Sequence, residues 1–346
     1  MTNIFGLTKK ELEEKLVSLG EKAFRATQIY EWIYRKKVQS FDEMTNMSKK
    51  SIEILKENFS FDRLNVEMEH LSKDGTRKYL FKLSDGNFIE TVLMKHNYGN
   101  SVCVSSQVGC NMGCSFCASG LNKRKRNLET FELVEQIQLI DEILNKQNEK
   151  VSHVVVMGIG EPFDNYENLT SFLRIINDPK GLEIGARHIT VSTCGVVPKI
   201  YEFSDFDLQV NLAISLHFPN DILRSEHMLI NRAYNIEDLF KALKYYYDKT
   251  NRRITFEYIL IDGINDSLDH AKELVNLIRG MNCYVNLIPM NSTSKILRRS
   301  TNENMDNFYD YLAKNRIPVT LRREQGHDID AACGQLRIKR EGKWED

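Results

Sequence analysis

The sequence predicts an α/β fold, in which a small helical domain and an antiparallel β-meander precede a barrel or partial barrel of βα units. Three observations lead to this prediction: helical apolar spacing near the N-terminus, two hairpin-turn dipeptides after it, and a strand–loop–helix rhythm from about residue 100 onward. Alternating βα units are typical of a parallel sheet, closed or open. We expect the three parts to span residues 1–62, 63–98 and 99–346.

The N-terminal part carries the apolar spacing of amphipathic helices. Leu12, Leu16 and Leu19 lie at helical spacing, and residues 29–33 and 47–59 form two further amphipathic runs. Apolar residues recurring every three to four positions bury one face of a helix. We therefore expect a small helical domain over residues 1–62.

The middle part alternates apolar and polar residues over three short segments, residues 64–71, 78–83 and 88–94. Asp74-Gly75 and Asp85-Gly86 separate these segments. Asp-Gly between alternating runs is a strong signal for a hairpin turn. The pattern predicts a small antiparallel meander that links the helical domain to the main domain.

The main domain contains seven strand candidates, with helical runs between most of them. The strands are expected at residues 102–106, 153–157, 188–192, 209–215, 254–261, 284–289 and 318–322. Helical runs include residues 128–146, 236–247, 268–279 and 305–315. Neither GxGxxG opening a helix nor GxxxxGK[ST] occurs, so a barrel fits better than a dinucleotide-binding sheet.

The composition indicates a folded chain with almost no net charge. The 346 residues are 42% hydrophobic and 10% aromatic, and 47 Lys+Arg against 48 Asp+Glu give a formal charge of −1. No apolar run approaches the roughly 20 residues of a membrane-spanning helix, and the N-terminus lacks the features of a secretory signal. We expect a cytoplasmic protein without membrane association and, in the absence of a coiled-coil repeat, a monomer.

The seven cysteines are unevenly distributed. Cys103, Cys110, Cys114 and Cys117 lie close together, which in a chain without an export signal favours metal or redox chemistry over a disulfide framework. The last three form a Cys-x3-Cys-x2-Cys run after the first strand of the main domain. Three thiolates can hold three corners of a [4Fe-4S] cluster and leave one iron open. A zinc site would require four ligands, typically in two pairs, and purely structural cysteines would not crowd into one glycine-rich turn.

Most polar or glycine-rich motifs of the main domain follow a predicted strand. They lie at residues 158–161, 192–195, 215–217, 289–291 and 322–335. In parallel α/β barrels the carboxyl ends of the strands form the rim at which catalytic loops gather. Any one of these motifs could be an ordinary βα turn, but their joint placement predicts a functional site at this rim.

The cysteine run after a first barrel strand resembles the signature of radical S-adenosylmethionine (SAM) enzymes. Further motifs resemble those of the RNA adenine-C2 methyltransferases (RlmN type), namely SSQVGC (105–110), GIGEP (158–162), SLH (215–217) and GHDIDAACGQL (326–336). This resemblance covers almost the whole chain. It implies a partial (βα)6 radical SAM barrel, an N-terminal helical domain that assists RNA binding, and a [4Fe-4S] cluster on the three cysteines of the run.

The resemblance also implies a mechanism with two working cysteines. Cys333 would take a methyl group from one SAM, and a radical from a second SAM would abstract hydrogen from that methyl group. The carbon radical would add to C2 of an adenine in 23S rRNA or in some tRNAs, and Cys103 would release the product by forming a disulfide with Cys333. Glu90 matches the proton acceptor, but it could equally pair with a basic residue, and Cys103 could serve as the base. Cys194 and Cys283 receive no role.

The resemblance further implies which residues contact SAM. Gly160 and Glu161 match the segment that binds the SAM amino group. Polar contacts to the carboxylate, ribose or adenine are matched by Ser192, Ser215, Leu216, His217 and Asn291. His217 could otherwise be a satisfied core histidine, which is the more common fate of a lone histidine. Two SAM molecules per turnover and an electron donor such as a flavodoxin or ferredoxin are part of the same expectation.

Local basic clusters offset the near-zero net charge. They are Lys123–Arg126, Arg298-Arg299, Arg322-Arg323, and Arg337 with Lys339 and Arg340; Lys36, Lys37, Lys49 and Lys50 extend them into the helical domain. Because the first four clusters flank the expected rim loops, phosphate contacts could concentrate there. A target adenine inside structured RNA would have to leave its stack to reach the cluster.

Two other functions remain open at this point. One is the closely related C8-methylating enzyme that confers ribosome-antibiotic resistance (Cfr type), which shares Cys103, Cys333 and the cluster. Gly160-Glu161-Pro162 and Val108 resemble the C2 enzymes more closely. The other is a metal-stabilised RNA-binding module without catalysis, which would leave Cys333 and the strand-end motifs unexplained.

Overall fold

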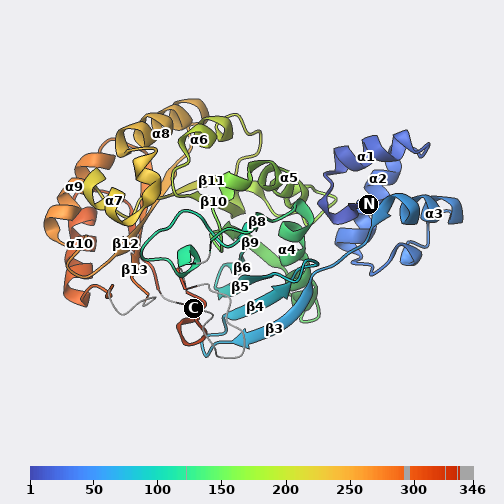
Figure 1. Cartoon of the computed structure of the whole chain (residues 1–346), viewed down its shortest axis with the longest axis horizontal. Coiled ribbons are helices and arrows are strands. Elements are labelled where there is room, and N and C mark those ends of the chain that lie inside the picture. The colour runs from blue at the N-terminus through green and yellow to red at the C-terminus, as the bar shows by residue number, and fades with distance from the viewer. Residues whose placement is uncertain (122, 292–296, 324, 333, 336–346) are drawn as a thin grey trace.

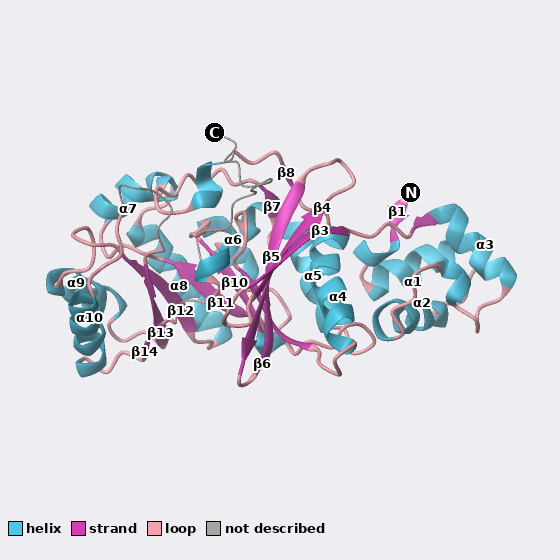
Figure 2. Ribbon diagram, turned by 90° about the horizontal axis from the view of Figure 1, so that it is seen from below, coloured by secondary structure: helices cyan, strands magenta, loops and turns pink. Residues whose placement is uncertain are grey.

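The computed structural model describes residues 1–121, 123–291, 297–323, 325–332 and 334–335. A curved ten-stranded sheet forms the centre of the molecule, with the helices of the main domain along its outer side (Figure 1). A small group of N-terminal helices lies at one end, beside α4 and α5 (Figures 1 and 2). None of the described helices is both long and apolar enough to cross a membrane.

The N-terminal helices form where the apolar spacing predicts them. They are α1 (Lys9–Ser18), α2 (Phe24–Tyr30) and α3 (Lys49–Asn58), with a π-helical turn at Glu31–Arg35 after α2. Thr8 begins α1 with a capping box, in which its side chain accepts from the Glu11 N–H and the Glu11 carboxylate accepts from the Thr8 N–H. The short strands β1 (Thr2–Asn3) and β2 (Phe59–Ser60) pair in parallel and close this part of the chain.

Ion pairs hold the N-terminal helices against α4 (Thr130–Asn145) of the main domain. Arg63 donates to Glu135 at 2.5 Å and to Glu142 at 2.8 Å, and Lys37 pairs with Asp141. All five side chains are largely shielded from solvent. Lys37, which the basic-cluster hypothesis places on an RNA-binding surface, is thus engaged inside the molecule.

The predicted meander forms three antiparallel strands, β3 (Asn65–Leu71), β4 (Arg77–Lys82) and β5 (Phe88–His96). β5 also pairs antiparallel with β6 (Gly99–Cys103), the first strand of the main domain. The meander is therefore continuous with the main sheet and widens it at one edge.

The main domain alternates parallel strands and helices. After β6 the strands are β9 (Val151–Val156), β10 (Ile189–Thr193), β11 (Asn211–Ser215), β12 (Ile254–Leu260), β13 (Cys283–Pro289) and β14 (Val319–Leu321). After α4 the helices are α5 (Tyr166–Asn177), α6 (Val197–Phe203), α7 (Asp221–His227), α8 (Ile236–Thr250), α9 (Leu268–Ile278) and α10 (Asn302–Lys314). A short hairpin, β7 (Gln107–Val108) with β8 (Arg126–Asn127), lies outside this rhythm.

The strands follow the order β14-β13-β12-β11-β10-β9-β6-β5-β4-β3. Within the described ranges β14 and β3 pair with one neighbour each, so the sheet is an open, partial barrel, and six βα units precede β14. This confirms the predicted fold class. A continuous apolar core fills the space between the sheet and its helices.

The first barrel strand is shifted from its predicted position. It ends at Cys103, whereas the alternation suggested residues 102–106. Beyond it, the Ser105 N–H donates to the Gln136 side chain at 2.8 Å, and the Ser105 hydroxyl donates to the Glu90 carbonyl at 2.6 Å. Val104 still donates its N–H to the Val155 carbonyl at 3.0 Å, and the chain then leaves the strand ladder and turns toward the cysteine loop.

Candidate active site

A cavity of about 160 Å³ lies at the carboxyl ends of the parallel strands. The three cysteines of the run line it together with residues at or near the ends of five neighbouring strands, β9 to β13. The predicted site residues among its lining are Cys110, Cys114, Cys117, Gly160, Glu161, Ser192, Ser215 and His217. The cysteine segment between β6 and β8 lies inside the arc of the strands (Figure 1). The fold thus brings together residues that are more than 100 positions apart in the chain.

The cysteine loop is shaped by glycine and anchored to α7. Gly113 has a φ of +62°, and a Cβ there would lie 2.9 Å from the Leu229 side chain. A side chain at this position would be both strained and crowded. Ser115 fixes the outer part of the loop, because its N–H donates to the His227 carbonyl at 3.0 Å and its hydroxyl is hydrogen-bonded to the His227 ring.

The three thiols fit an iron–sulfur cluster by their chemistry and surroundings. Burial raises the pKa of Cys110 to about 11, and burial together with the neighbouring thiols raises the pKa of Cys114 well above its usual value. Thiolates in this pocket therefore require a cationic partner. No three or more His, Cys, Asp or Glu side chains in the described part of the chain converge like the ligands of a single ion. A [4Fe-4S] cube does not need such convergence, because each thiolate binds a different iron.

The Gly158–Glu161 loop packs tightly against the start of the cysteine segment. A Cβ on Gly160 would lie 2.6 Å from the Gln107 side chain, and the Gly160 φ is +109°. A Cβ on Gly158 would lie 2.7 Å from the Val104 carbonyl. Only glycine allows the loop after β9 to come this close to the segment after β6.

Glu161 uses its carboxylate to hold two rim loops. One carboxylate oxygen accepts from the Phe163 N–H at 2.9 Å and the other from the Cys194 N–H at 2.8 Å. Burial raises the pKa of Glu161, while these hydrogen bonds oppose that shift. The side chain therefore ties the loop after β9 to the loop after β10, and the residue lines the cavity.

Ser192 is the next-to-last residue of β10 and Ser215 the last residue of the adjacent β11, and their hydroxyls lie 3.3 Å apart. His217 follows two residues later with a φ of +59°. Its Nδ1 accepts from the Ile259 N–H at 3.1 Å, so the proton of the neutral ring is on Nε2. Burial, with a smaller effect of Arg224, lowers the pKa of His217 to about 3. The ring is therefore a neutral hydrogen-bond donor at the cavity wall.

Leu216 differs from its neighbours, because its side chain is fully buried in the main core. Its carbonyl accepts from the guanidinium of Arg224, which also donates to the Cys194 carbonyl at 2.6 Å. Arg224 is fully buried and was not singled out from the sequence. Helix α7 is mostly polar, and a single arginine in a polar helix cannot be distinguished from a surface residue by sequence alone.

A second cavity of about 60 Å³ adjoins the first. Cys103, Asn291, Ala332 and Arg323 line it, and it shares lining residues with the first cavity, namely Cys117, Ser119, Met157, Gly158, Ile288, Arg322 and Gly334. Cys103 is buried at its wall. Cys333 lies outside the described residues, but Ala332 and Gly334 on either side of it line this cavity.

Glu90 is buried and forms an ion pair with Lys78. The Lys78 amine lies 3.2 Å from the Glu90 carboxylate and also donates to the Asp330 carbonyl at 3.3 Å. Pairing with a basic residue is one of the roles that the sequence left open for Glu90. Lys78 was missed as a site residue, because β4 also contains Arg77 and Lys82 and nothing in the sequence distinguishes Lys78 from these other basic residues.

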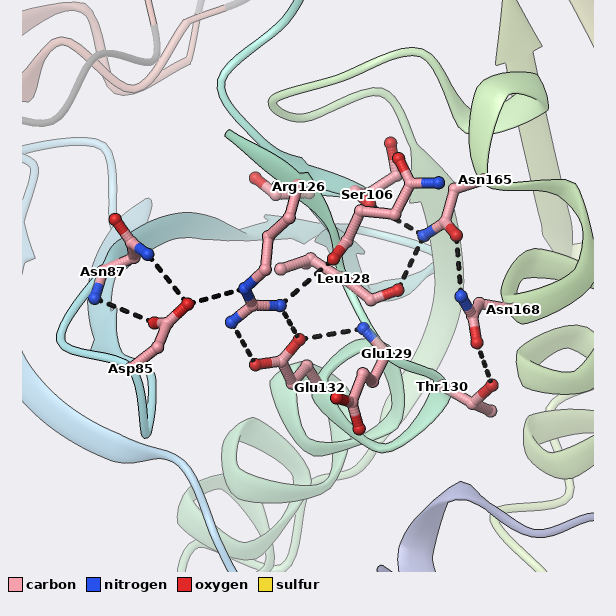
Figure 3. Close-up of polar contacts among 12 residues, drawn as sticks. Asp85, Asn87, Ser106, Arg126, Leu128, Glu129, Thr130, Glu132, Asn165 and Asn168 are labelled. Atoms are coloured by element: carbon pink, nitrogen blue, oxygen red, sulfur yellow. Dashed lines mark hydrogen bonds and ion pairs between the residues drawn. The ribbon is translucent and has the colours of Figure 1, made fainter. Parts of the chain in front are cut away.

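The basic clusters divide between internal ion pairs and exposed positions. Arg126 forms a two-pronged interaction with Glu132 at 2.7 and 2.8 Å and donates to Asp85 at 2.6 Å (Figure 3). Arg124 pairs with Asp164 at 3.0 Å, whereas Lys123 and Lys125 are exposed. The cluster of Arg337, Lys339 and Arg340 lies outside the described residues.

Comparison with known proteins identifies the class that this fold and site define. The model of the radical SAM superfamily matches residues 104–278, and that of the ribosomal RNA large subunit methyltransferase N-terminal domain matches residues 2–60. A radical SAM methyltransferase from Sphaerobacter thermophilus of known crystal structure is 43% identical, with a TM-score of 0.93 over 97% of this chain and 99% of that one. The chain is therefore a radical SAM enzyme, a class that implies a [4Fe-4S] cluster and SAM.

Two relatives narrow the class further. "Probable dual-specificity RNA methyltransferase RlmN" from Spiroplasma citri is 56% identical over 99% of both chains. The protein of the same name from Geobacillus kaustophilus is 55% identical over 98% of this chain and 93% of its own. The chain belongs to the RlmN family of dual-specificity RNA methyltransferases, and it is a SAM-dependent RNA methyltransferase.

Proposed function

We propose that this enzyme methylates C2 of an adenine in 23S rRNA and in some tRNAs, through Cys333 and Cys103. The observation that supports the proposal is the pair of adjoining cavities. The three cluster cysteines line the first, while Cys103 and the residues flanking Cys333 line the second. A base in the second cavity would lie next to Cys103 and to the two residues that flank Cys333, within reach of chemistry started in the first.

C2 of adenine is an electron-poor aromatic carbon, so it does not attack the electrophilic methyl group of SAM directly. A radical route avoids this difficulty. A [4Fe-4S] cluster with one open iron supplies the electron that cleaves SAM, and three protein thiolates leave such an iron. Cys110, Cys114 and Cys117 are the residues that would hold it.

The steps assigned to the protein concern the two cysteines. The Cys333 sulfur takes the methyl group of one SAM and loses its proton. After a hydrogen atom is removed from this S-methyl group by a radical derived from a second SAM, the carbon radical on Cys333 bonds to C2 of the base. The adduct then gives up the C2 proton to a base and one electron, which the oxidised cluster held by Cys110, Cys114 and Cys117 would take up. The Cys103 thiolate attacks the Cys333 sulfur, the S–C bond breaks, and the released carbon takes up a proton to become the methyl group.

The proton from C2 requires an acceptor, and we assign this role to Glu90 or Cys103. The Lys78 amine lies 3.2 Å from the Glu90 carboxylate, so a cation lies beside this candidate acceptor. Cys103 lines the second cavity and is the alternative base. If Glu90 is the base, Glu90→Gln blocks proton removal and Cys103→Ala blocks only release of the adduct; if Cys103 is the base, Cys103→Ala blocks both steps.

We assign SAM to the first cavity. Gly160 and Glu161 contribute the wall that faces the SAM amino group, and Ser192, Ser215 and His217 supply hydroxyl and imidazole donors. The Leu216 side chain lies in the core, so its role is to position Ser215 and His217, which flank it and line the cavity. Asn291 lines the second cavity and is assigned to the boundary between the two ligands.

Residues 1–62 are proposed to assist RNA binding, with Lys49 and Lys50 exposed on α3. Residues 63–98 extend the sheet toward residues 99–346, which carry the chemistry. Reduction of the cluster would require an external electron donor such as a flavodoxin or ferredoxin.

Nucleoside mass spectrometry of RNA tests the proposed position. RNA from cells that lack the enzyme is compared with RNA from cells that express it, and 23S rRNA and tRNA are digested separately. We expect 2-methyladenosine to disappear from both in the cells that lack the enzyme. Appearance of 8-methyladenosine on expression would instead identify the C8 activity of the Cfr type and overturn the C2 assignment.

Substitution of Cys103 tests the two-cysteine mechanism. Cys103→Ala is expected to accumulate a covalent protein–RNA adduct, detected as an RNA-bearing band on a denaturing gel. Cys283→Ala is the matched control, because Cys283 is also buried but lies away from both cavities. Normal turnover by Cys103→Ala without an adduct would refute the mechanism.

A further inference from the structure

A row of polar side chains crosses four adjacent strands below the rim of the first cavity. Ser215 on β11 is in register with Glu257 on β12, Glu257 with Asn286 on β13, and Asn286 with Thr320 on β14. The Asn286 amide donates to one Glu257 carboxylate oxygen at 2.9 Å, which shows that these two side chains lie on the same face. Ser215 and Glu257 both line the cavity that contains the three cluster cysteines.

Glu257 is incompletely satisfied within the protein. The residue is only 3% exposed, and its second carboxylate oxygen has no hydrogen-bond partner among the described atoms. A buried carboxylate oxygen without a partner is costly, and native proteins usually provide one. Arg322, which lines the same cavity, acts on Glu257 electrostatically. Because Glu257 lines the cavity, we infer that this buried oxygen is directed toward a ligand bound there.

We propose that Glu257 is a SAM-binding residue, whose second carboxylate oxygen accepts a hydrogen bond from a hydroxyl or amino group of the adenosine part of SAM. The adenosine offers three such donor groups, the 2′-hydroxyl, the 3′-hydroxyl and the N6 amine. Glu257 lines the cysteine cavity and is not among the residues that line the second cavity, which favours SAM over the RNA base as its partner.

Asn286 has a defined part in this arrangement. By donating to the first carboxylate oxygen of Glu257, it fixes the rotation of the carboxylate and leaves the second oxygen for the ligand. Ser192 and Ser215, whose hydroxyls lie 3.3 Å apart, form the adjoining section of the wall. A nucleoside lying against this wall meets one acceptor-only group and two hydroxyls, which suits a molecule with both donors and acceptors.

The experiment measures binding of S-adenosylhomocysteine to the cluster-loaded enzyme by anaerobic titration calorimetry. Glu257→Gln keeps the size of the side chain and an oxygen for Asn286, but presents an amide N–H to the ligand. We expect this variant to bind about tenfold to a hundredfold more weakly, as for loss of a hydrogen bond to a charged group. Glu303→Gln, a change of an exposed glutamate on α10, is the matched control and should bind as the wild type does.

Three analogues of S-adenosylhomocysteine identify the donor: the 2′-deoxy, 3′-deoxy and 6-deamino forms. The analogue that lacks the partner of Glu257 should bind more weakly to the wild type but lose little further affinity in Glu257→Gln. Unchanged affinity of Glu257→Gln, or the same penalty in both proteins for every analogue, would overturn the proposal.

Glu257→Asp separates direct contact from a general effect of charge. It keeps the negative charge beside Arg322 but withdraws the carboxylate by one methylene group. We expect it to bind S-adenosylhomocysteine as weakly as Glu257→Gln. Wild-type affinity of Glu257→Asp would show that the charge alone matters and would overturn the proposed hydrogen bond. These binding results do not depend on which carbon of adenine is methylated.

Discussion

Replacing Lys78 by methionine is expected to destabilise the protein by about 3–5 kcal/mol, because the change removes a cation from beside a buried carboxylate. The Lys78 amine lies 3.2 Å from the Glu90 carboxylate, and the two side chains are only 8% and 3% exposed. Solvent therefore cannot take over the role of the lysine. The same amine donates to the Asp330 carbonyl at 3.3 Å, so the change also removes a tie to the segment that leads to Cys333.

A double-mutant cycle of Lys78→Met and Glu90→Gln, followed by urea denaturation, measures this effect. Each single variant leaves one charged or polar partner behind, whereas the double variant removes both charges. We expect the double variant to be more stable than Lys78→Met alone, since replacing both members of a buried pair is often close to neutral.

The neighbouring Arg77 provides the matched control. Arg77 pairs with Glu69 at 2.8 Å, but these side chains are 25% and 37% exposed. Because exposed ion pairs contribute only about 0–1 kcal/mol, Arg77→Met should change the free energy of unfolding little. A loss below about 1 kcal/mol for Lys78→Met, or a double variant less stable than either single variant, would refute the reasoning.

Three further predictions concern backbone, protonation and RNA contact. Gly160→Ala should destabilise by more than Gly263→Ala in urea denaturation, because both have positive φ but only Gly160 would place a Cβ against a neighbour, 2.6 Å from Gln107. Since burial lowers the pKa of His217 to about 3, the unfolded chain binds a proton near pH 6.5 that the folded chain rejects. Stability should therefore fall as the pH drops from about 6.5 toward 3, by at most about 1.4 kcal/mol per pH unit, and less steeply in His217→Asn. Lys123→Ala should weaken RNA binding in a salt-dependent filter-binding assay with little loss of stability. Arg126→Ala should lower the stability and change the salt dependence of RNA binding little.

The fold was largely predictable because its signals are local. The Asp74-Gly75 and Asp85-Gly86 turns and the alternating strands around them are short-range patterns, and β3, β4 and β5 form where these patterns place them. The rim also followed from topology, since the carboxyl ends of parallel strands meet at one edge. Strand ends were less certain, as the shift of β6 to Gly99–Cys103 shows.

The unpredicted features depend on pairs of residues far apart in the chain. Arg63 meets Glu135 across the contact between the helical domain and α4, and Lys78 meets the segment around Asp330. Neither pair can be predicted from sequence periodicity, because a single charged residue in a strand or helix is expected to be exposed to solvent. Glu257 was missed for the same reason, and only its register with Ser215 and Asn286 reveals its position in the cavity.

The internal ion pairs also narrow the RNA-binding surface. In the cluster at residues 123–126, Arg126 is held by Glu132 and Asp85, and Arg124 by Asp164, so their charges are already neutralised within the protein. Lys123 and Lys125 remain exposed. If phosphates contact this cluster, we expect the two lysines to account for the salt dependence of binding, about one released counterion for each. The arginines would instead keep the hairpin of β7 and β8 in place beside the cysteine loop, so their contribution to RNA binding is to position that loop.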